Sequence, residues 1–524
     1  MRLREWEVWY TYGLYFEEPL PDLASAAAEL VASGLAEATL QSDGTARWYA
    51  SGDVKTASLR MDVDPSLRRA TINFPGGINH PFAVETLYQC GYLRYGEQVT
   101  LGERSAFTPP YVRTLLGQME LRSPRRILSM YPILKLHATG VLLIGFRMIG
   151  SGALLSHRAF IDRFVHLPGE TFAEWWVPPA LARIIPSVGV DGQASPQLGR
   201  DAHDAAVDYC TEVGNPHLNL HLAPVGGAES GWTLTDVTHT LADVVRLIAD
   251  RAIAVRHREL RFGHHWSARP NIHLIKFVRQ QPTSAENEAV FGHAFGSILA
   301  GVIDDDADVN LRFLTPNARP FSDYAIYTNS AARLWVHATR SLRAKRELPL
   351  DPNRGAFVYE QQAIADAIDH ACALHHRLAA AASDADAIER ALEQQRTLVA
   401  LEVALQSTGR TGDVRDLIRR NLDELGVPAL RGAAQQLLHL QQQHLALRAE
   451  RRASAWATAM TFVFGLAAVP PIARDVIEPL WKLAGWHVAT NPVIAQLVYV
   501  SIAVVSVITA IGAVRLAVDL RQKE

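Results

Sequence analysis

The stretch "ASAWATAMTFVFGLAAVPPIA", residues 453–473, contains 21 residues without a charged side chain. A second uncharged stretch, residues 493–514, contains 22. Each has the length of about 20 residues that an α-helix needs to cross roughly 30 Å of hydrocarbon. One such stretch can also be the buried helix of a soluble protein. Two of them at one end of a chain favour a pair of transmembrane helices, 453–473 and 493–514.

The basic residues that flank these stretches predict their orientation. The connection from 474 to 492 holds only Arg474 and Lys482 as basic residues. Basic residues are enriched on the cytoplasmic side of membranes, so we expect both chain ends in the cytoplasm and the connection outside. The expected location is the inner membrane of a bacterial cell, crossed twice. Six basic residues lie on the outer flanks: Arg448, Arg451, Arg452, Arg515, Arg521 and Lys523.

The bulk composition excludes several classes of protein. A chain of 524 residues is too long for one core, so we expect two or three structural units. The net charge of −3 offers no basic surplus, which argues against nucleic acid as a partner. Cys90, Cys210 and Cys372 form no C-x-x-C pair, which indicates a reduced environment without structural zinc. The N-terminal sequence "MRLREWEVWY" lacks the apolar core of an export signal.

Residues 1–350 have the pattern of a cytosolic α/β domain, with a possible subdivision near residue 190. Runs rich in aromatic and β-branched residues predict strands, and residues 241–260 have helical periodicity. The apolar segment 131–150 is interrupted by Lys135, His137 and Arg147, so we expect two strands joined in a hairpin rather than a third membrane span. The predicted strands are 5–16, 219–225, 271–278 and 323–328.

Residues 351–452 have the composition of a helical stalk region. Helices are expected at about 357–407, at 412–424 and from 429 onward. No Gly or Pro lies between Ala433 and Gly465, so the last helix should run unbroken into the first span, a rod of about 60 Å. Its stripe of similarly placed residues favours packing against copies of itself, and packing of one helix on its own domain is the alternative. The stripe consists of Leu437, Leu440, His444 and Leu447.

This order of elements resembles the CorA-type divalent cation transporters. The resemblance covers residues 350–524 in architecture and about a dozen residues in sequence. That family ends its first span with a segment of the type T-F-I-A-G-I-Y-G-M-N-F, and "TFVFGLAAVPP" at 461–471 matches it at Thr461, Phe462, Gly465 and Leu466. The family signature G-M-N falls on Ala-Val-Pro here and is absent. The resemblance implies a homopentamer whose first spans line a pore for Mg²⁺ or another divalent cation.

The loss of the motif asparagine weakens the case for magnesium, because Mg²⁺ is recognised through its waters by oxygen ligands. Hydroxyls and freed backbone carbonyls near the two prolines remain as oxygen donors, although Ser and Thr in spans often bond their own helix. The residues expected to line the pore are Thr458, Thr461, Phe464, Gly465, Ala468, Val469 and Pro470.

Acidic residues supply two further candidate sites. Asp475 and Glu478 in the expected external loop would repeat around a pentameric entrance and concentrate cations, or be neutralised by Arg474 and Lys482. Hard oxygen ligands also gather in "IDDDADVN", which lacks the Gly and closing Glu of an EF-hand, so an ordinary acidic loop is the alternative. The candidate metal ligands there are Asp304, Asp305, Asp306 and Asp308.

Histidines provide weaker candidates for metal binding. His217 and His221 would share a face of one strand, and His264, His265 and His273 lie close in sequence, but ordinary strand histidines are more common than zinc ligands. No phosphate-binding loop, nucleophile elbow or metalloprotease motif occurs in the chain, so we expect no enzyme.

Three functions fit the sequence. The first is a CorA-like homo-oligomeric channel or transporter for divalent cations, in which an unknown cytosolic ligand shifts a closed–open equilibrium. The second is a ligand-gated membrane effector with a non-selective pore, acting in stress or phage defence. The third is an enzyme or scaffold that the helical hairpin anchors to the lipid bilayer.

Overall fold

The computed structural model describes most of the chain, in two compact units, Met1–Gln435 and Gln436–Glu524. The boundary predicted near residue 190 lies outside the described residues, as do His217, His264 and His265. The described residues are 1–64, 69–74, 76–78, 80–102, 109–178, 181, 220–222, 231–253, 260–262, 269–319, 321–340, 356–384, 388–407, 412–485 and 492–521.

The first unit contains the strands. They are β1 (Arg2–Phe16), β2 (Ala38–Gln41), β3 (Thr45–Ala50), β4 (Asp53–Ser58), β5 (Arg60–Asp64), β6 (Arg69–Asn73), β7 (Tyr111–Leu115), β8 (Met119–Ser123), β9 (Arg126–His137), β10 (Val141–Ser156), β11 (Glu174–Val177), β12 (Leu220–Leu222), β13 (Leu260–Phe262), β14 (Arg269–Phe277), β15 (Tyr324–Thr328) and β16 (Arg333–His337).

The α-helices in the described residues are α1 (Leu23–Ala32), α2 (Pro81–Leu101), α3 (His157–Phe160), α6 (Leu234–Ile253), α7 (Ser284–Ala300), α8 (Ala307–Arg312), α10 (Ala356–Ser383), α11 (Ile388–Ser407), α12 (Gly412–Glu424), α13 (Val427–Ile472), α14 (Glu478–Leu483) and α15 (Pro492–Arg521). A π-helical turn, Ala473–Ile477, joins α13 to α14.

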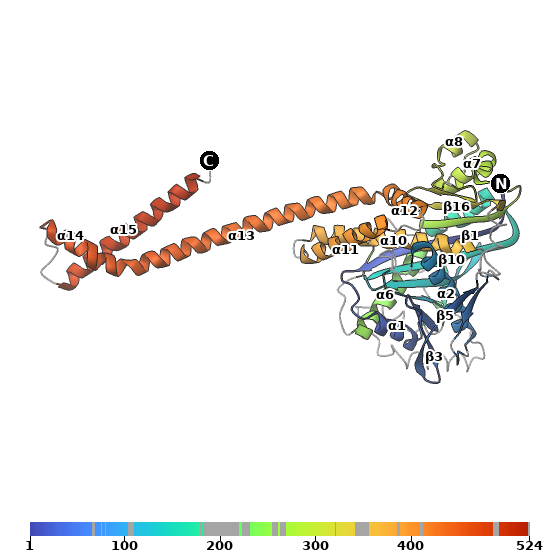
Figure 1. Cartoon of the computed structure of the whole chain (residues 1–524), viewed down its shortest axis with the longest axis horizontal. Coiled ribbons are helices and arrows are strands. Elements are labelled where there is room, and N and C mark those ends of the chain that lie inside the picture. The colour runs from blue at the N-terminus through green and yellow to red at the C-terminus, as the bar shows by residue number, and fades with distance from the viewer. Residues whose placement is uncertain are drawn as a thin grey trace. The chain divides into compact units, whose positions relative to one another are not determined.

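A large sheet organises the first unit around β1 (Figure 1). Its main path has the order β15-β16-β14-β1-β10-β9-β7-β2-β3-β4. β1 pairs with β10 on one side and with β14 on the other, with Tyr10 opposite Phe146 and Pro270. Among the described strands, β14 and β16 run parallel and the other pairs are antiparallel. β1 is thus a central strand, which explains why Trp6–Phe16 is buried throughout.

The two faces of this sheet differ in chemistry, because side chains alternate along each strand. Even-numbered residues of β1, from Trp6 to Phe16, join an apolar cluster with residues of α1, α6 and α7. The opposite face is also buried but carries polar groups, and α2 and α10 cover it (Figure 1). Its buried polar residues include Glu7, Thr11, Arg113, Lys135, His137, Asn271, His273, Arg333 and His337.

Ion pairs connect this polar face to the two helices that cover it. The Arg113 guanidinium lies 2.6 Å from both Glu97 of α2 and Asp366 of α10. Lys135 lies 2.5 Å from Glu97 and 3.3 Å from Asp366, so two cations face two carboxylates. All four residues are buried. A buried charge that loses its partner is costly, so removing one member of this quartet should weaken the packing of α2 and α10 on the sheet.

Two histidines in the same layer make stability depend on pH. Burial lowers the pKa of His370 to about 3, and burial also lowers that of His137, which lies beside it. Below about pH 6.5 the unfolded chain binds protons that these folded histidines do not. Stability should then fall by up to about 1.4 kcal/mol per pH unit for each histidine.

At lower pH, Glu97 adds a further decrease in the stability of the folded chain. Burial alone would raise its pKa, but Arg113 and Lys135 hold it at about 2, so the folded carboxylate stays charged where the unfolded one is protonated. Urea midpoints measured on the full chain between pH 7.5 and 3 should fall steadily as the pH decreases. His370→Gln should reduce the slope between pH 6.5 and 4.5, and a midpoint constant over that range contradicts the account.

The structure confirms the hairpin predicted for 131–150, because β9 and β10 pair with Leu142 opposite Leu136. The helix expected at 241–260 lies at Leu234–Ile253. One long helix expected at 357–407 is two, α10 and α11. The reason lies in "SDAD", where the Ser383 hydroxyl donates to the carbonyl of Ala380 and the Asp384 amide bonds in a tight turn to Ala381.

Helices α10, α11 and α12 belong to the first compact unit and not to a separate stalk. α13 begins at Val427, two residues earlier than predicted. The break before it is Gly426, whose φ of 68° is a left-handed conformation that favours glycine. Pro428 fits inside the first turn of α13 because its missing N–H would have no helical partner there.

Candidate functional site: the paired apolar helices

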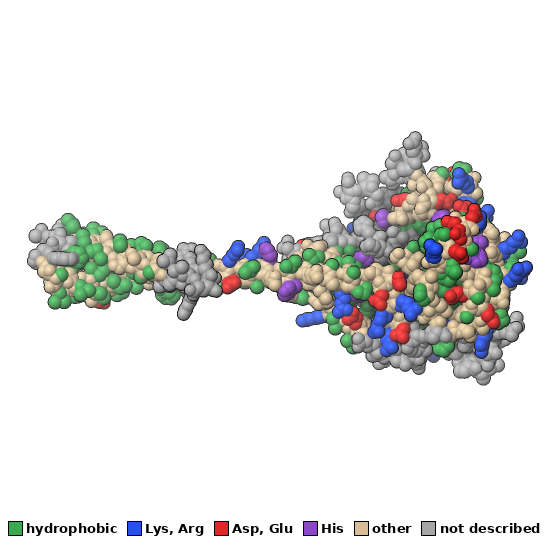
Figure 2. All heavy atoms as spheres, turned by 90° about the horizontal axis from the view of Figure 1, so that it is seen from above, with side chains coloured by type: hydrophobic (Ala, Val, Ile, Leu, Met, Phe, Trp, Pro, Cys, Tyr) green, Lys and Arg blue, Asp and Glu red, His purple; other side chains and the backbone are tan. Residues whose placement is uncertain are grey.

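Two helices in the described residues are long and apolar enough to cross a membrane. One is the continuous helical stretch Val427–Leu483, and the other is Pro492–Ala513. Most of their side chains are exposed, including Trp456, Phe464 and Val505. Figure 2 shows hydrophobic side chains over this end of the chain, while charged side chains gather on the first unit. The two helices are compatible with a membrane protein.

α13 and α15 contact each other through small and apolar residues. Val469 and Ala473 are buried against Tyr499 and Ala503 of α15. A Cβ atom at Gly465 would lie 2.8 Å from Cγ1 of Val507 and 2.9 Å from Cδ1 of Ile511. Gly465 therefore marks a close approach of the two helices, which small residues permit in membranes.

We expect Gly465→Leu to disturb this helix pair. The added side chain would enter the space of Val507 and Ile511, and overpacking of this kind costs about 1–3 kcal/mol. The measurement is the denaturation midpoint of the helical region in detergent micelles. Gly512→Leu is the matched control, because a Cβ atom at Gly512 meets nothing within 4 Å. Equal midpoints for both variants contradict the close approach.

The structure divides the residues predicted to line a pore. Gly465 and Val469 face α15 within the same chain. Phe464 and Pro470 are exposed, and Ala468 is half-buried. The Thr458 hydroxyl donates to the carbonyl of Ser454. That of Thr461 donates to the carbonyl of Ala457, so both hydroxyls bond their own helix, the alternative that sequence analysis left open.

The connection between the spans is helical through Leu483, and the loop predicted from 474 was wrong over that part. Pro470 and Pro471 lie inside α13 instead of ending it. Each lacks an N–H, and the π-helical turn that follows accommodates the altered bonding. Asp475 lies in that turn. Glu478 begins α14 and pairs with Lys482 at 2.7 Å. This ion pair supports the alternative in which neighbouring basic residues neutralise the charge of the acidic residues.

Three of the four aspartates proposed as a metal site have hydrogen-bonding or ion-pairing roles within the fold. Asp306 caps α8 by accepting from the amide of Asp308 at 2.8 Å. Asp304 accepts from the amide of Asp306 in the same way, and Asp305 pairs with Arg158 at 2.5 Å. Within the described ranges, no group of three or more His, Cys, Asp or Glu side chains is placed to hold a metal ion.

His273 and His221 also lie in strands. The ring nitrogens of His273 contact Gln361 at 2.8 Å and Asn271 at 3.2 Å, so its hydrogen-bonding capacity is used. His221 of β12 lies opposite Trp176 of β11, in an antiparallel pair of strands. The zinc hypothesis for His217 and His221 depends on a residue outside the described ranges.

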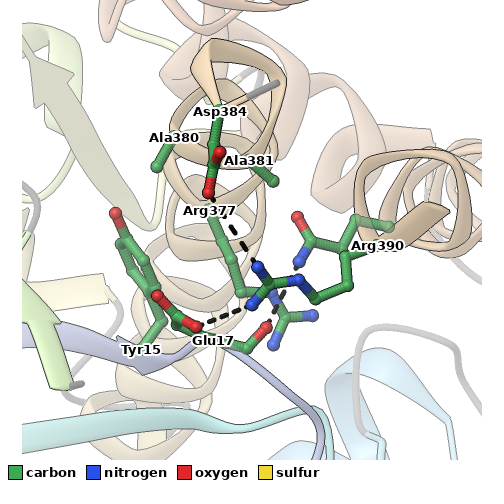
Figure 3. A pocket seen from close by; sticks show the side chains of 8 residues that line it. Tyr15, Glu17, Arg377, Ala380, Ala381, Asp384 and Arg390 are labelled. Carbon is green, nitrogen blue, oxygen red and sulfur yellow. Dashed lines mark hydrogen bonds and ion pairs between the residues drawn. The ribbon is translucent and has the colours of Figure 1, made fainter. Parts of the chain in front are cut away.

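A small pocket near the end of β1 was not predicted from the sequence (Figure 3). Arg390 of α11 donates to Glu17 at 2.6 Å and lies 4.0 Å from Asp384, the residue after α10. Arg377 donates to the carbonyl of Thr139. The cavity of about 20 Å³ has room for about one water molecule, so these residues fasten α10 and α11 to the sheet.

A larger cleft was also missed. It has a volume of about 450 Å³ and lies among helices α10 to α13 within the first unit. No local sequence pattern indicates this cleft, because its lining residues come from four separate helices. The lining residues are His375, Leu401, Glu402, Arg419, Leu422, Asp423, Val427, Pro428, Arg431, Gly432 and Gln435.

Comparisons of the chain with protein-family models, curated proteins and solved structures returned no match.

Proposed function

We propose that the protein is a homo-oligomeric membrane channel of CorA-like build, in which α13 of each copy borders the pore and the first unit controls opening. Both chain ends would be cytoplasmic, in a bacterial inner membrane, and a pentamer is the expected assembly. The proposal requires no covalent chemistry, because ions would move down their gradient.

The observation that carries the proposal is a row of exposed leucines on α13, in the part of the helix that precedes its apolar portion. α13 is one helix from Val427 to Ile472, and its apolar portion begins at Ala453. Before that point Leu437, Leu440 and Leu447 are 40%, 57% and 53% exposed in the single chain. Together with His444 they keep the three-four spacing of a coiled-coil seam. Leucines with this spacing on a helix outside hydrocarbon favour association with copies of the same helix.

The side of α13 that faces away from α15 supports a pore of low selectivity. Met460, Val463 and Phe464 are exposed there, and none offers an oxygen ligand. The hydroxyls of Thr458 and Thr461 are oriented by donation to their own backbone, and residues 453–473 contain no carboxylate or amide side chain that could form a charged or amide ring around an ion. A lumen with such walls would gate by excluding water. This favours the second candidate, a ligand-gated membrane effector, over a magnesium transporter.

Disulfide cross-linking tests the arrangement without requiring an open pore. Phe464→Cys and Val505→Cys replace side chains of similar exposure, 66% and 63%, on the two helices. Oxidation with copper phenanthroline in lipid nanodiscs should link copies through position 464 and leave position 505 unlinked. The wild-type chain, which contains the native Cys90, Cys210 and Cys372, serves as the blank. Equal linking at both positions, or none at 464, contradicts a central α13.

Growth experiments separate the two kinds of channel. A transporter should restore growth of a bacterial strain that lacks its own magnesium or zinc uptake. An effector should leave such a strain unrescued and be toxic only when its trigger is present. A membrane-anchored enzyme or scaffold, the third reading, predicts a monomer in detergent.

A further inference from the structure

The cleft of about 450 Å³ among α10, α11, α12 and α13 has the size of a small-molecule site. Its walls come from four helices of the first unit, and the first turns of α13 form one of them, from Val427 to Gln435. Leu401, Leu422 and Val427 give the walls an apolar part. A molecule bound here would contact the start of the helix that continues into the apolar segment.

A buried histidine supplies a free acceptor to this cleft. His375 is 4% exposed, and its Nδ1 lies 2.8 Å from the carbonyl oxygen of Ala371. A carbonyl oxygen accepts only, so Nδ1 carries the proton and the neutral ring leaves Nε2 as an acceptor. Burial and the charge of Arg431 lower the pKa of His375, which keeps the ring neutral. Nε2 has no hydrogen-bond partner among the described residues and is not closed off by them.

Two unpaired charges lie at the exposed rim. Arg419 and Asp423 both line the cleft and both come from α12, one turn apart. Neither forms an ion pair within the described part of the chain, not even with the other. Arg431 of α13, which also lines the cleft, is already paired with Glu402 of α11. The cleft thus presents a free cation and a free anion at its mouth and an acceptor at a buried position.

A glycine keeps the cleft open. Gly432 lies inside α13, where glycine is about 0.5–1 kcal/mol less favourable than alanine. A Cβ atom at this position would meet nothing within 4 Å, so packing does not require glycine. A side chain at 432 would instead project into the open space that Gly432 lines. This residue choice costs helix stability and preserves the volume of the cleft.

We propose that this cleft binds a small zwitterionic organic molecule with an apolar body and an N–H or O–H donor, and that the bound molecule regulates the pore. Its anionic group would pair with Arg419, its cationic group with Asp423, and its donor with Nε2 of His375. The regulatory half rests on the proposed channel function, and the binding half does not.

Equilibrium dialysis of the full chain in amphipol at pH 7.5 tests binding, with L-tryptophan and the dipeptide Trp-Ala as probes. Both are zwitterionic and carry an indole N–H. We expect saturable binding of at least one probe at one site per chain. His375→Leu and Arg419→Glu should each weaken it by about tenfold, the loss of one hydrogen bond or ion pair. Arg419 is exposed, so its variant should fold normally.

Gly432→Phe should abolish binding by filling the cleft. Ala433→Phe is the matched control, because Ala433 is exposed on the same turn and does not line the cleft. Absence of saturable binding for both probes overturns the proposal, and so does an equal effect of the two phenylalanine variants.

Ion flux from liposomes measures regulation separately. A bound probe should change the flux of the wild-type channel and leave that of Gly432→Phe unchanged. Binding without any effect on flux overturns the regulatory half. A monomeric chain that still binds the probe would contradict the channel and leave the site established.

Discussion

Asp366→Asn is expected to destabilise the first unit by about 3–5 kcal/mol, the largest effect on folding that we predict for a single substitution. The change leaves Arg113 and Lys135 with Glu97 as their one remaining carboxylate in the quartet, so a net positive charge is buried. Gln362, which donates to Asp366 at 2.7 Å, also loses its charged acceptor. The urea midpoint of the full chain in detergent, followed by tryptophan fluorescence, measures the loss.

Asp416→Asn is the control for this prediction. Asp416 lies on the surface of α12 and pairs only weakly with its neighbour Arg415, so its replacement should change stability by less than about 0.5 kcal/mol. Adding Lys135→Met to Asp366→Asn restores the charge balance, and the double variant should lose less than the sum of the two single losses. Strict additivity would show that the quartet does not act as one unit.

Leu440→Glu is expected to dissociate the oligomer while leaving the single chain folded. Leu440 is 57% exposed in the single chain, so its replacement removes little packing there. In a seam of α13 helices it would lie between copies, and a ring of buried glutamates would repel. Size-exclusion chromatography with light scattering, in detergent, should show a shift to monomer, with the urea midpoint of the first unit unchanged.

Leu445→Glu is the matched control. Leu445 is the same residue type on the same helix, is 46% exposed, and follows His444 of the stripe by one position. One position corresponds to about 100° around a helix, so Leu445 lies off the seam. Its variant should keep the wild-type assembly, and equal dissociation by both variants would argue against the seam.

The elements that local sequence patterns determine were predicted well. The two apolar helices follow from their length without charge, and the β9–β10 hairpin follows from the polar interruptions at Lys135 and His137. The interpretation of those two residues was incomplete, because they were treated only as breaks in an apolar run. They lie on the buried polar face of the sheet, where Lys135 contacts Asp366.

The polar layer depends on contacts that are distant in sequence. Arg113 and Asp366 are 253 positions apart, and neither belongs to a motif that predicts the other. On α10 the polar residues Gln362, Asp366 and Asp369 recur at helical spacing, which on sequence alone is typical of a solvent-exposed face. These residues can face the protein interior because the strands that α10 covers present a matching polar face.

The local sequence likewise could not predict which side of α13 each residue occupies. Gly465 and Val469 matched a family motif by position, but the packing of α15 determines which way they face. Glu478 was assigned to a loop because it follows the uncharged stretch that ends at residue 473. The π-helical turn after Pro471 extends the helix instead, and this turn has no sequence signature that distinguishes it from a helix end.

The central claim is that copies of this chain assemble around α13. Native mass spectrometry of the full chain in lipid nanodiscs tests it most directly. We expect one closed oligomer, a pentamer at five times the chain mass of 57.7 kDa, and its loss in Leu440→Glu. A wild-type chain that stays at 57.7 kDa at every concentration tested would contradict the account.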